Sequence, residues 1–160
     1  MRLIIVSGLS GSGKSVALAM LEDLEYYCVD NIPAGLLPGF IAYTVRTSES
    51  TYRQTAVGVD ARNRPEDLAE VPRLVESLGK SGIACEMRTT VHPDLLSAES
   101  LWRVAESLAR RGARHFVVQE FRAAGCMDGV LRERAASGYL VPGQLRDMAR
   151  LFTTFEVRRS

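Results

Sequence analysis

The sequence lacks long apolar runs, is poor in cysteine and carries almost no net charge. No stretch of its 160 residues approaches the roughly 18 consecutive apolar residues that a membrane-spanning helix requires. Its three cysteines, Cys28, Cys85 and Cys126, are odd in number and far apart, which fits neither a disulfide framework nor a closely spaced metal site. A formal net charge of +1 gives no overall attraction to nucleic acid. We therefore expect no membrane span and cysteines that are buried free thiols.

The composition is that of a globular protein of about one domain. Hydrophobic residues make up 46% of the chain and charged residues 24%, and no internal repeat or low-complexity tract is present. The apolar run within residues 1–6 ends at Ser7 without a longer apolar region or a cleavage site, which argues against a secretory signal. We expect a soluble, cytoplasmic protein. The arginine-dense stretches, typical of a solvated helix face, are residues 110–114 and 132–134.

Short apolar runs alternate with amphipathic segments along the chain, which predicts an α/β fold with a mainly parallel sheet. Residues 3–6 form a continuous apolar run, typical of a strand that is buried on both faces of such a sheet. Strands are predicted over residues 3–6, 26–29, 56–59, 83–91, 116–119 and 155–158. Helices are predicted over residues 14–24, 65–78, 97–108 and 144–151, with a surface connection over 44–55.

The glycine-rich segment between the first predicted strand and the first predicted helix matches a motif that binds phosphate. It fits the pattern G-x-x-x-x-G-K-[ST] without a mismatch, with Gly8, Leu9, Ser10, Gly11, Ser12, Gly13, Lys14 and Ser15. Glycines let backbone N–H groups converge on a phosphate without obstruction by Cβ atoms, and the helix that follows adds unpaired donors and a favourable dipole. Lys14 would reach the β and γ phosphates of a nucleoside triphosphate, and the Ser15 hydroxyl would ligate Mg²⁺.

The alternative for this segment is a glycine-rich turn that holds no ligand, but the strand before it and the helix after it are the context that phosphate binding requires. Hydrolysis or transfer is a separate matter, because it needs an activated water or acceptor and usually a second acidic residue near the metal. Asp30 and Asp60 each follow a short apolar run and would lie on the ligand side of the sheet; the alternative for each is a turn or helix-capping aspartate. Arg62 would contact phosphate or be an exposed arginine.

Three separated segments occur in the order found in a known family: the P-loop, its continuation SVALAMLEDLEYYCVDNIPAGLLP, and AVGVDARNRPEDL. Together they resemble the start of the RapZ/YvcJ family of nucleotide-binding proteins, whose best-known member is an RNase adaptor. The resemblance covers about residues 1–85 and implies ATP binding at residues 8–15. It also implies RNA or an RNase as partners and GTP binding at Asp60, Ala61, Arg62 and Asn63.

After Glu86 the pattern of that family stops. The family would continue with an apolar strand ending in an aspartate, an arginine-rich segment and a C-terminal domain associated with RNA binding, none of which is recognisable here. Residues 87–129 instead resemble the last βα units of radical-SAM enzymes that activate anaerobic ribonucleotide reductase, and 145–158 resembles their closing helix and strand. The residues that in that family would lie around a strand end facing S-adenosylmethionine are Thr89, Thr90, Val91 and His92.

The radical chemistry of the second family is not expected in this chain. Its iron–sulfur cluster needs three closely spaced cysteines, and the chain has no C-x-x-x-C-x-x-C motif. We therefore interpret His92 as a polar residue that opens a loop before Pro93, His115 as a strand-edge residue and Cys126 as an ordinary loop thiol.

Two segments are thus predicted, a P-loop nucleotide-binding segment over residues 1–86 and βα units resembling the end of a radical-SAM barrel over 87–160. They would be joined near residues 79–88, and the second can pack into the same domain as the first. The predicted function is binding of ATP or GTP with Mg²⁺ by a RapZ-like protein without its usual second half. One alternative is a truncated radical-SAM fragment, without an iron–sulfur cluster, that acts at most as a binding module; another is a poorly folded fusion.

Overall fold

The protein is described by a computed structural model, which defines residues 1–8, 14–47, 50–60, 73–79, 82–123, 129–133 and 140–159. The strands are β1 (Arg2–Gly8), β2 (Tyr27–Ile32), β3 (Gln54–Asp60), β4 (Ala84–Val91), β5 (His115–Glu120) and β6 (Thr154–Arg158). The helices are α1 (Lys14–Glu22), α2 (Leu37–Thr47), α4 (Ala98–Arg110), α5 (Gly129–Glu133) and α6 (Pro142–Ala149). Residues 73–79 are also helical, and two short 3-10 turns are η1 (Ala34–Leu36) and η2 (Ser50–Tyr52).

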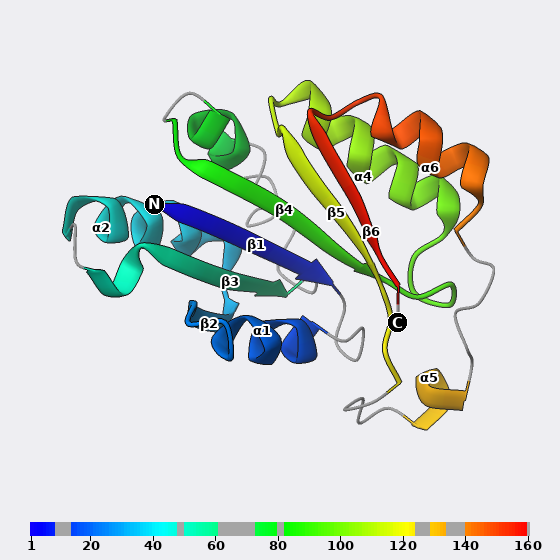
Figure 1. Cartoon of the computed structure of the whole chain (residues 1–160), viewed down its shortest axis with the longest axis horizontal. Coiled ribbons are helices and arrows are strands. Elements are labelled where there is room, and N and C mark those ends of the chain that lie inside the picture. Colours follow the sequence, from blue (N-terminus) through cyan, green and yellow to red (C-terminus); the bar gives the residue numbers. More distant parts are fainter. Residues whose placement is uncertain are drawn as a thin grey trace.

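The six strands form one sheet in the order β2-β3-β1-β4-β5-β6, and every pairing between neighbours is parallel (Figure 1). The chain therefore places β2 and β3 on one side of β1, with β3 between β1 and β2, and then adds β4, β5 and β6 in turn on the other side. The predicted α/β fold with a parallel sheet is confirmed. Among the described residues, no helix is long and apolar enough to cross a bilayer.

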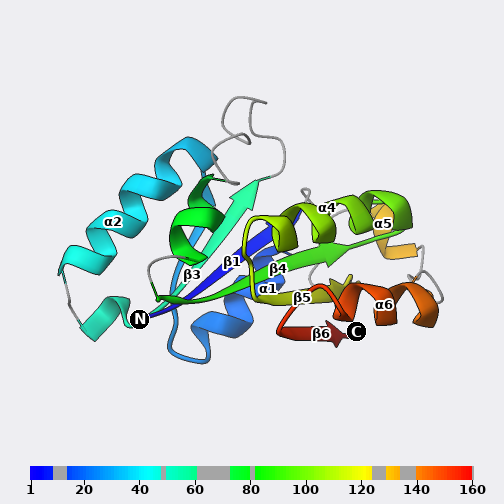
Figure 2. The ribbon, with the colours of Figure 1, turned by 90° about the horizontal axis from the view of Figure 1, so that it is seen from above.

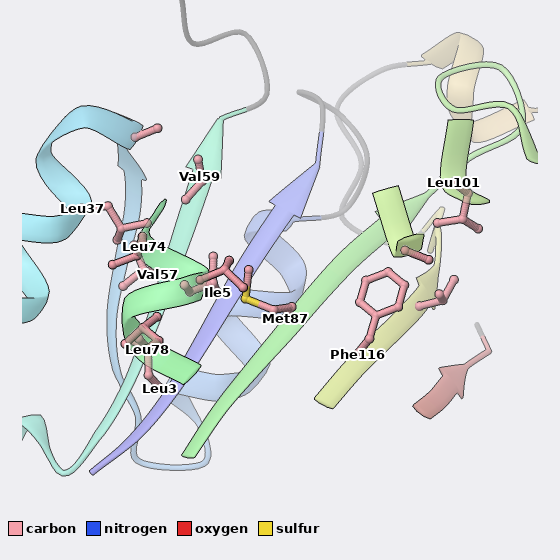
Figure 3. Packing of buried hydrophobic residues seen from close by; sticks show 14 of the residues in the cluster. Leu3, Ile5, Leu37, Val57, Val59, Leu74, Leu78, Met87, Leu101 and Phe116 are labelled. Carbon is pink, nitrogen blue, oxygen red and sulfur yellow. The ribbon is translucent and has the colours of Figure 1, made fainter. Parts of the chain in front are cut away.

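Helices cover both faces of the sheet (Figure 2), and each face carries its own hydrophobic core. Alternate residues of β1 point to opposite faces, so Leu3 and Ile5 join the larger core, beneath α2, residues 73–79, α4 and α6. Figure 3 shows how this core continues from Ile5 across the sheet to Phe116. Ile4 and Val6 point the other way and pack with α1. Burial on both faces explains why β1 is a continuous apolar run.

The strand that follows the predicted join lies directly beside the P-loop strand. β4 pairs with β1 from Arg2 opposite Ala84 to Ser7 opposite Thr89. The described residues on either side of the join therefore share one sheet, and β4 also contributes Met87 and Val91 to the larger core.

The first helix is shorter than predicted, and its buried side differs. Leu24, predicted to lie on the buried stripe, is 65% exposed and lies beyond the end of α1. A Schellman motif ends the helix: the N–H of Tyr26 donates to the carbonyl of Leu21, that of Glu25 donates to Glu22, and Glu25 takes a left-handed φ of 64°. Met20 is also exposed, and the buried residues of α1 are Lys14, Ala17, Leu18 and Leu21.

The predicted surface connection over 44–55 is too long at both ends. Its first residues belong to α2, where the buried Thr44 hydroxyl donates to the carbonyl of Ile41 at 2.9 Å. This local hydrogen bond lets a polar residue lie in a buried helical position. The connection itself is the short stretch around η2, because β3 begins at Gln54.

The other predicted elements are confirmed with shifted ends. β2 begins one residue later and ends three later than predicted, α6 begins at Pro142, and the described part of the helix predicted over 65–78 is residues 73–79. Cys28 and Cys85 are free thiols as predicted, although each is half-buried rather than fully buried, and Cys126 lies outside the described residues.

Candidate functional site

The described ends of the glycine-rich motif, Gly8 and Lys14, lie at the carboxyl edge of the sheet. Gly8 is the last residue of β1 and Lys14 the first of α1, whereas residues 9–13 lie outside the described part of the chain. β1 is also the strand on whose two sides the sheet is built in opposite directions. Such a switch point, with a helix N-terminus beside it, is where parallel α/β sheets bind phosphorylated ligands.

Lys14 is buried and held by two side chains from the end of β2. Only 5% of the residue is exposed. Its ammonium donates to the Asp30 carboxylate and, at 2.7 Å, to Oδ1 of Asn31. The neighbouring Ser15 hydroxyl donates to Oδ2 of Asp30 at 3.1 Å. The two motif side chains predicted to contact phosphate and metal therefore meet at one carboxylate.

Asp30 is kept in its charged form by these contacts. Burial by itself would raise the pKa of the Asp30 carboxyl, but the hydrogen bond and positive charge of Lys14 lower it, helped by the N–H of Asn31 and the Ser15 hydroxyl. The net result is a pKa below the ordinary value. Asp30 is therefore a carboxylate at neutral pH, and the helix N-terminus holds a negative group.

Two backbone features make room for this arrangement. Asn31 takes a left-handed φ of 56°, and its N–H donates to the Asp30 carboxylate at 2.7 Å. Gly58 of β3 lies beneath the carboxylate: a Cβ there would come within 2.7 Å of Cδ1 of Leu18 and collide with Oδ1 of Asp30. Asparagine tolerates this backbone region better than most residues, and a strand glycine often marks such a close approach.

The strand ends beyond β1 contribute polar groups of their own. Ser7 and Thr89 are joined by a hydrogen bond of 3.1 Å between their hydroxyls. His92 opens the turn after β4, as predicted, and is fully buried, with Nδ1 accepting the N–H of Asp94 at 3.2 Å and its ring edge-on to Phe121.

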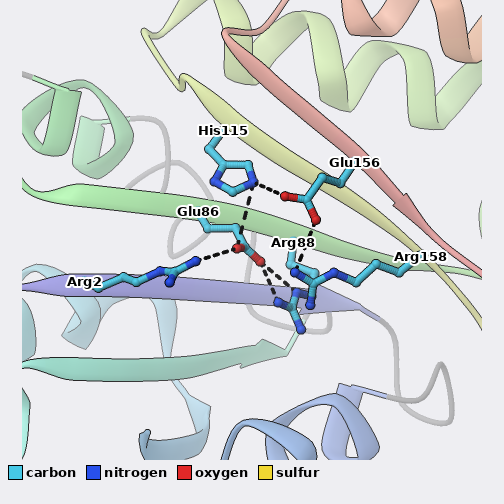
Figure 4. A network of polar contacts seen from close by, with 6 residues as sticks. All are labelled: Arg2, Glu86, Arg88, His115, Glu156 and Arg158. Carbon is cyan, nitrogen blue, oxygen red and sulfur yellow. Dashed lines mark hydrogen bonds and ion pairs between the residues drawn. The ribbon is translucent and has the colours of Figure 1, made fainter. Parts of the chain in front are cut away.

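A polar network crosses β1, β4, β5 and β6 on the face that carries α1 (Figure 4). Its centre is the buried pair of Glu86 and Arg88, joined at 2.6 Å. His115 begins β5, as predicted for a strand-edge residue, and its Nε2 lies 3.1 Å from Oε1 of Glu156. Burial would raise the pKa of Glu156, but the hydrogen bonds and charges of Arg158 and His115 lower it. Oε2 of Glu86 is buried without a hydrogen-bond partner among the described residues; Arg2 lies 4.0 Å and His115 3.9 Å from it.

The remaining predicted site residues are only partly described. Asp60 ends β3 and pairs in register with Gly8, so its backbone lies beside the start of the P-loop. Ala61, Arg62 and Asn63 lie outside the described residues. Within the described ranges, no cluster of three or more His, Cys, Asp or Glu side chains could hold a metal ion by itself.

Two residues of the site are not predicted as such from the sequence. In the sequence, Asn31 is recognisable only as the end of a predicted strand. An Asp-Asn pair after an apolar run is nevertheless a signal of a left-handed turn, which can present side-chain oxygens. Gly58 stands within the apolar run of β3, where a glycine signals a close approach by another group.

Comparison with known proteins identifies relatives of the first part of the chain. The family model described as the RapZ-like N-terminal domain matches residues 1–87. A "Nucleotide-binding protein" of Alkalilimnicola ehrlichii is 52% identical over 86 residues, which are 54% of this chain and 30% of that protein. One of Stutzerimonas stutzeri is 51% identical over 87 residues, which are 54% of this chain and 30% of the relative.

A third relative extends the match. A "Nucleotide-binding protein" of Nitrosococcus oceani is 38% identical over 120 residues, which are 75% of this chain and 41% of that protein. An alignment of this length reaches beyond residue 87 and into the segment predicted to resemble radical-SAM enzymes. That resemblance stays a prediction. The chain spans 30% to 41% of the length of these three relatives.

Proposed function

The chain belongs to the family of RapZ-like N-terminal domains, which its first 87 residues match, and from this premise we propose that it binds a purine nucleoside triphosphate through residues 8–15. The observation that carries the proposal is the placement of Lys14 and Ser15. Both lie in the first turn of α1, and both side chains converge on one anionic group, the Asp30 carboxylate. The names of the relatives, which call them nucleotide-binding proteins, support the same conclusion.

The chemistry of the site suits a triphosphate. The first turn of a helix offers unpaired N–H groups and the positive end of the helix dipole, and Lys14 adds a full positive charge that is screened little by solvent because the side chain is buried. Hydrogen bonds between charged partners are roughly twice as strong as neutral ones. Lys14 would hold the terminal phosphates while the backbone positions them.

Magnesium fits the oxygen donors that the site presents. Mg²⁺ prefers oxygen ligands and usually takes one or two from the protein, with phosphate oxygens and water completing its shell. The Ser15 hydroxyl and the Asp30 carboxylate, 3.1 Å apart, are such donors. When bound, the ion would neutralise charge on the β and γ phosphates. We propose nucleotide binding and not hydrolysis, because hydrolysis also needs a positioned water or acceptor.

The family resemblance adds finer proposals. ATP would bind at residues 8–15, and GTP would bind at the segment Asp60, Ala61, Arg62 and Asn63. The register of Asp60 opposite Gly8, the first residue of the other segment, supports this proposal. An adaptor role toward RNA or an RNase would need the parts of the relatives that this chain does not span.

Isothermal titration with ATP and GTP in the presence of Mg²⁺ tests the proposal. In Lys14→Ala, loss of one charged hydrogen bond of about 1.5–3 kcal/mol weakens binding by tenfold or more. Arg150→Ala is the matched control, because the Arg150 side chain is 81% exposed and pairs with Asp147 on α6, away from the P-loop. It keeps wild-type affinity. Equal affinities for wild type and Lys14→Ala would refute the proposal.

The second candidate, an S-adenosylmethionine-binding module, has less support from the described residues. The Thr89 hydroxyl is bonded to Ser7, and His92 is fully buried, so neither side chain stands open to a ligand. Titration with S-adenosylmethionine distinguishes the two candidates: binding of this compound, together with no response to ATP or GTP, would favour the second.

A further inference from the structure

A cavity of about 300 Å³ lies at the amino edge of the sheet, where β1, β4 and β5 begin. Its volume is at the lower end of the range of about 300–1,000 Å³ that small-molecule sites occupy. The glycine-rich motif lies at the opposite edge. Because a strand rises about 3.3 Å per residue, the length of β1 from Arg2 to Gly8 separates the two places by about 20 Å. A ligand in this cavity would therefore bind apart from the proposed nucleotide.

The cavity has an apolar wall and a polar wall. The apolar wall is formed by buried side chains of the larger core, namely Val75, Leu78 and Met87. The polar wall carries three members of the network in Figure 4, namely Arg2, Glu86 and His115. Consecutive residues of β4 point to opposite faces, so Glu86 and Met87 reach the cavity from the two sides of the sheet. A ligand that fills this space needs both an apolar group and polar groups.

Glu86 provides the observation that points to a ligand. The residue is only 2% exposed, and Arg88 donates to its Oε1 at 2.6 Å. Its Oε2 has no hydrogen-bond partner in the described part of the chain. The nearest cations, Arg2 at 4.0 Å and His115 at 3.9 Å, both line the cavity but lie beyond hydrogen-bond distance. A buried acceptor without a donor is costly and rare in native proteins, so this oxygen lacks a partner that a ligand can supply.

Arg2 is placed to open this oxygen to a ligand and to bind the ligand itself. Its side chain is 54% exposed, and its ion pair with Glu86 is longer than a hydrogen bond. Long exposed side chains such as this one have many rotamers, so Arg2 can turn outward at little cost. A guanidinium binds carboxylates through two parallel hydrogen bonds. Arg114, which is exposed and also lines the cavity, adds a second positive charge.

We propose that this cavity binds a small zwitterion, an α-amino acid with an apolar side chain. Its ammonium donates to Oε2 of Glu86, its carboxylate pairs with Arg2, and its side chain packs against Val75 and Leu78. A simple amine would leave the two arginines without an anionic partner, and a fatty acid would leave Oε2 without a donor. The site is separate from the phosphate site, and its ligand binds whether or not the P-loop holds a nucleotide.

Isothermal titration with leucine and methionine tests this inference, beside two analogues of leucine that each lack one charged group. Isocaproate lacks the amine, and isoamylamine lacks the carboxylate. Wild type binds leucine at least about tenfold more tightly than either analogue, because each analogue loses one charge-assisted contact. Arg2→Gln weakens leucine and isocaproate by a similar factor of about ten and does not weaken isoamylamine. Arg103→Gln is the matched control, because the Arg103 side chain is 71% exposed on α4, outside the cavity lining.

Glu86→Gln tests the other contact, since it keeps the shape of the side chain but removes its charge. It weakens leucine by about tenfold and leaves the affinity for isocaproate unchanged. Urea unfolding shows whether this variant is folded, because Glu86 also holds the buried Arg88; the analogue comparison on wild type decides the matter if it is not. Three results would overturn the inference: folded wild type that binds neither amino acid, isocaproate that binds as tightly as leucine, or an Arg2→Gln variant that binds leucine as tightly as Arg103→Gln does.

Discussion

Substitution of Gly58 by alanine perturbs the candidate site from beneath and has a calculable cost. The new Cβ would lie 2.7 Å from Cδ1 of Leu18 and 3.3 Å from Cγ of Asp30, and it would collide with Oδ1 of that carboxylate. Overpacking of this kind costs about 1–3 kcal/mol, and displacing Asp30 removes one charged hydrogen bond from Lys14, worth about 1.5–3 kcal/mol. We expect Gly58→Ala to lower the free energy of unfolding by about 2–4 kcal/mol, because the two effects overlap.

Urea unfolding followed by circular dichroism measures this change, and a second glycine supplies a control of opposite sign. Gly39 lies in the first turn of α2, and a Cβ there meets nothing within 4 Å. Gly39→Ala should therefore stabilise the protein by about 0.5–1 kcal/mol, through the better helix propensity of alanine. A Gly58→Ala variant as stable as wild type, measured beside a stabilised Gly39→Ala, would refute the described packing of Asp30 against β3.

Three further predictions concern the rest of the fold. Ser97 caps α4 by accepting the N–H of Ser100, so Ser97→Ala should cost about 1 kcal/mol in urea unfolding. Burial, with the charge of Glu86, raises the pKa of Cys85 to about 12, so mass spectrometry should show much slower iodoacetamide labelling at pH 8 than for a free thiol. Because the pKa of Glu156 is lowered in the folded protein, its charged form stabilises the fold at pH values above the ordinary pKa of a glutamate. This stability is lost as the pH falls through the lowered pKa. Glu156→Gln should therefore make the free energy of unfolding depend less on pH in the acid range.

The parts of the fold that local patterns specify were predictable. The apolar run of β1, the glycine-rich motif and the helix after it occur in that order in the sequence and in the structure. The predicted helix starts at residues 97 and 144 lie close to the observed starts of α4 and α6, where Ser97 is the N-cap and Pro142 the first residue, because capping and the fixed φ of proline are local properties. The alternation of strands and helices was enough to predict a parallel sheet.

The parts that depend on tertiary contacts were not predictable. The end of α1 was misplaced because its left-handed terminal residue is Glu25 instead of the glycine that usually signals a Schellman motif. The convergence of Lys14 with Asp30 and Asn31 depends on β2 lying beyond β3, an order of strands that no local pattern specifies. For the same reason the sequence presents Asp30 only as one of two acidic strand ends.

The most direct test of the account is a titration of MgATP and MgGTP into wild type and Lys14→Ala, with urea unfolding to show that both are folded. Lys14 is buried and lies at the start of α1, and it is the group on which the proposed phosphate binding would depend. We predict saturable binding of at least one nucleotide by wild type, with an affinity tenfold or more weaker in Lys14→Ala. No binding by folded wild type, or binding that the variant retains in full, would contradict the account.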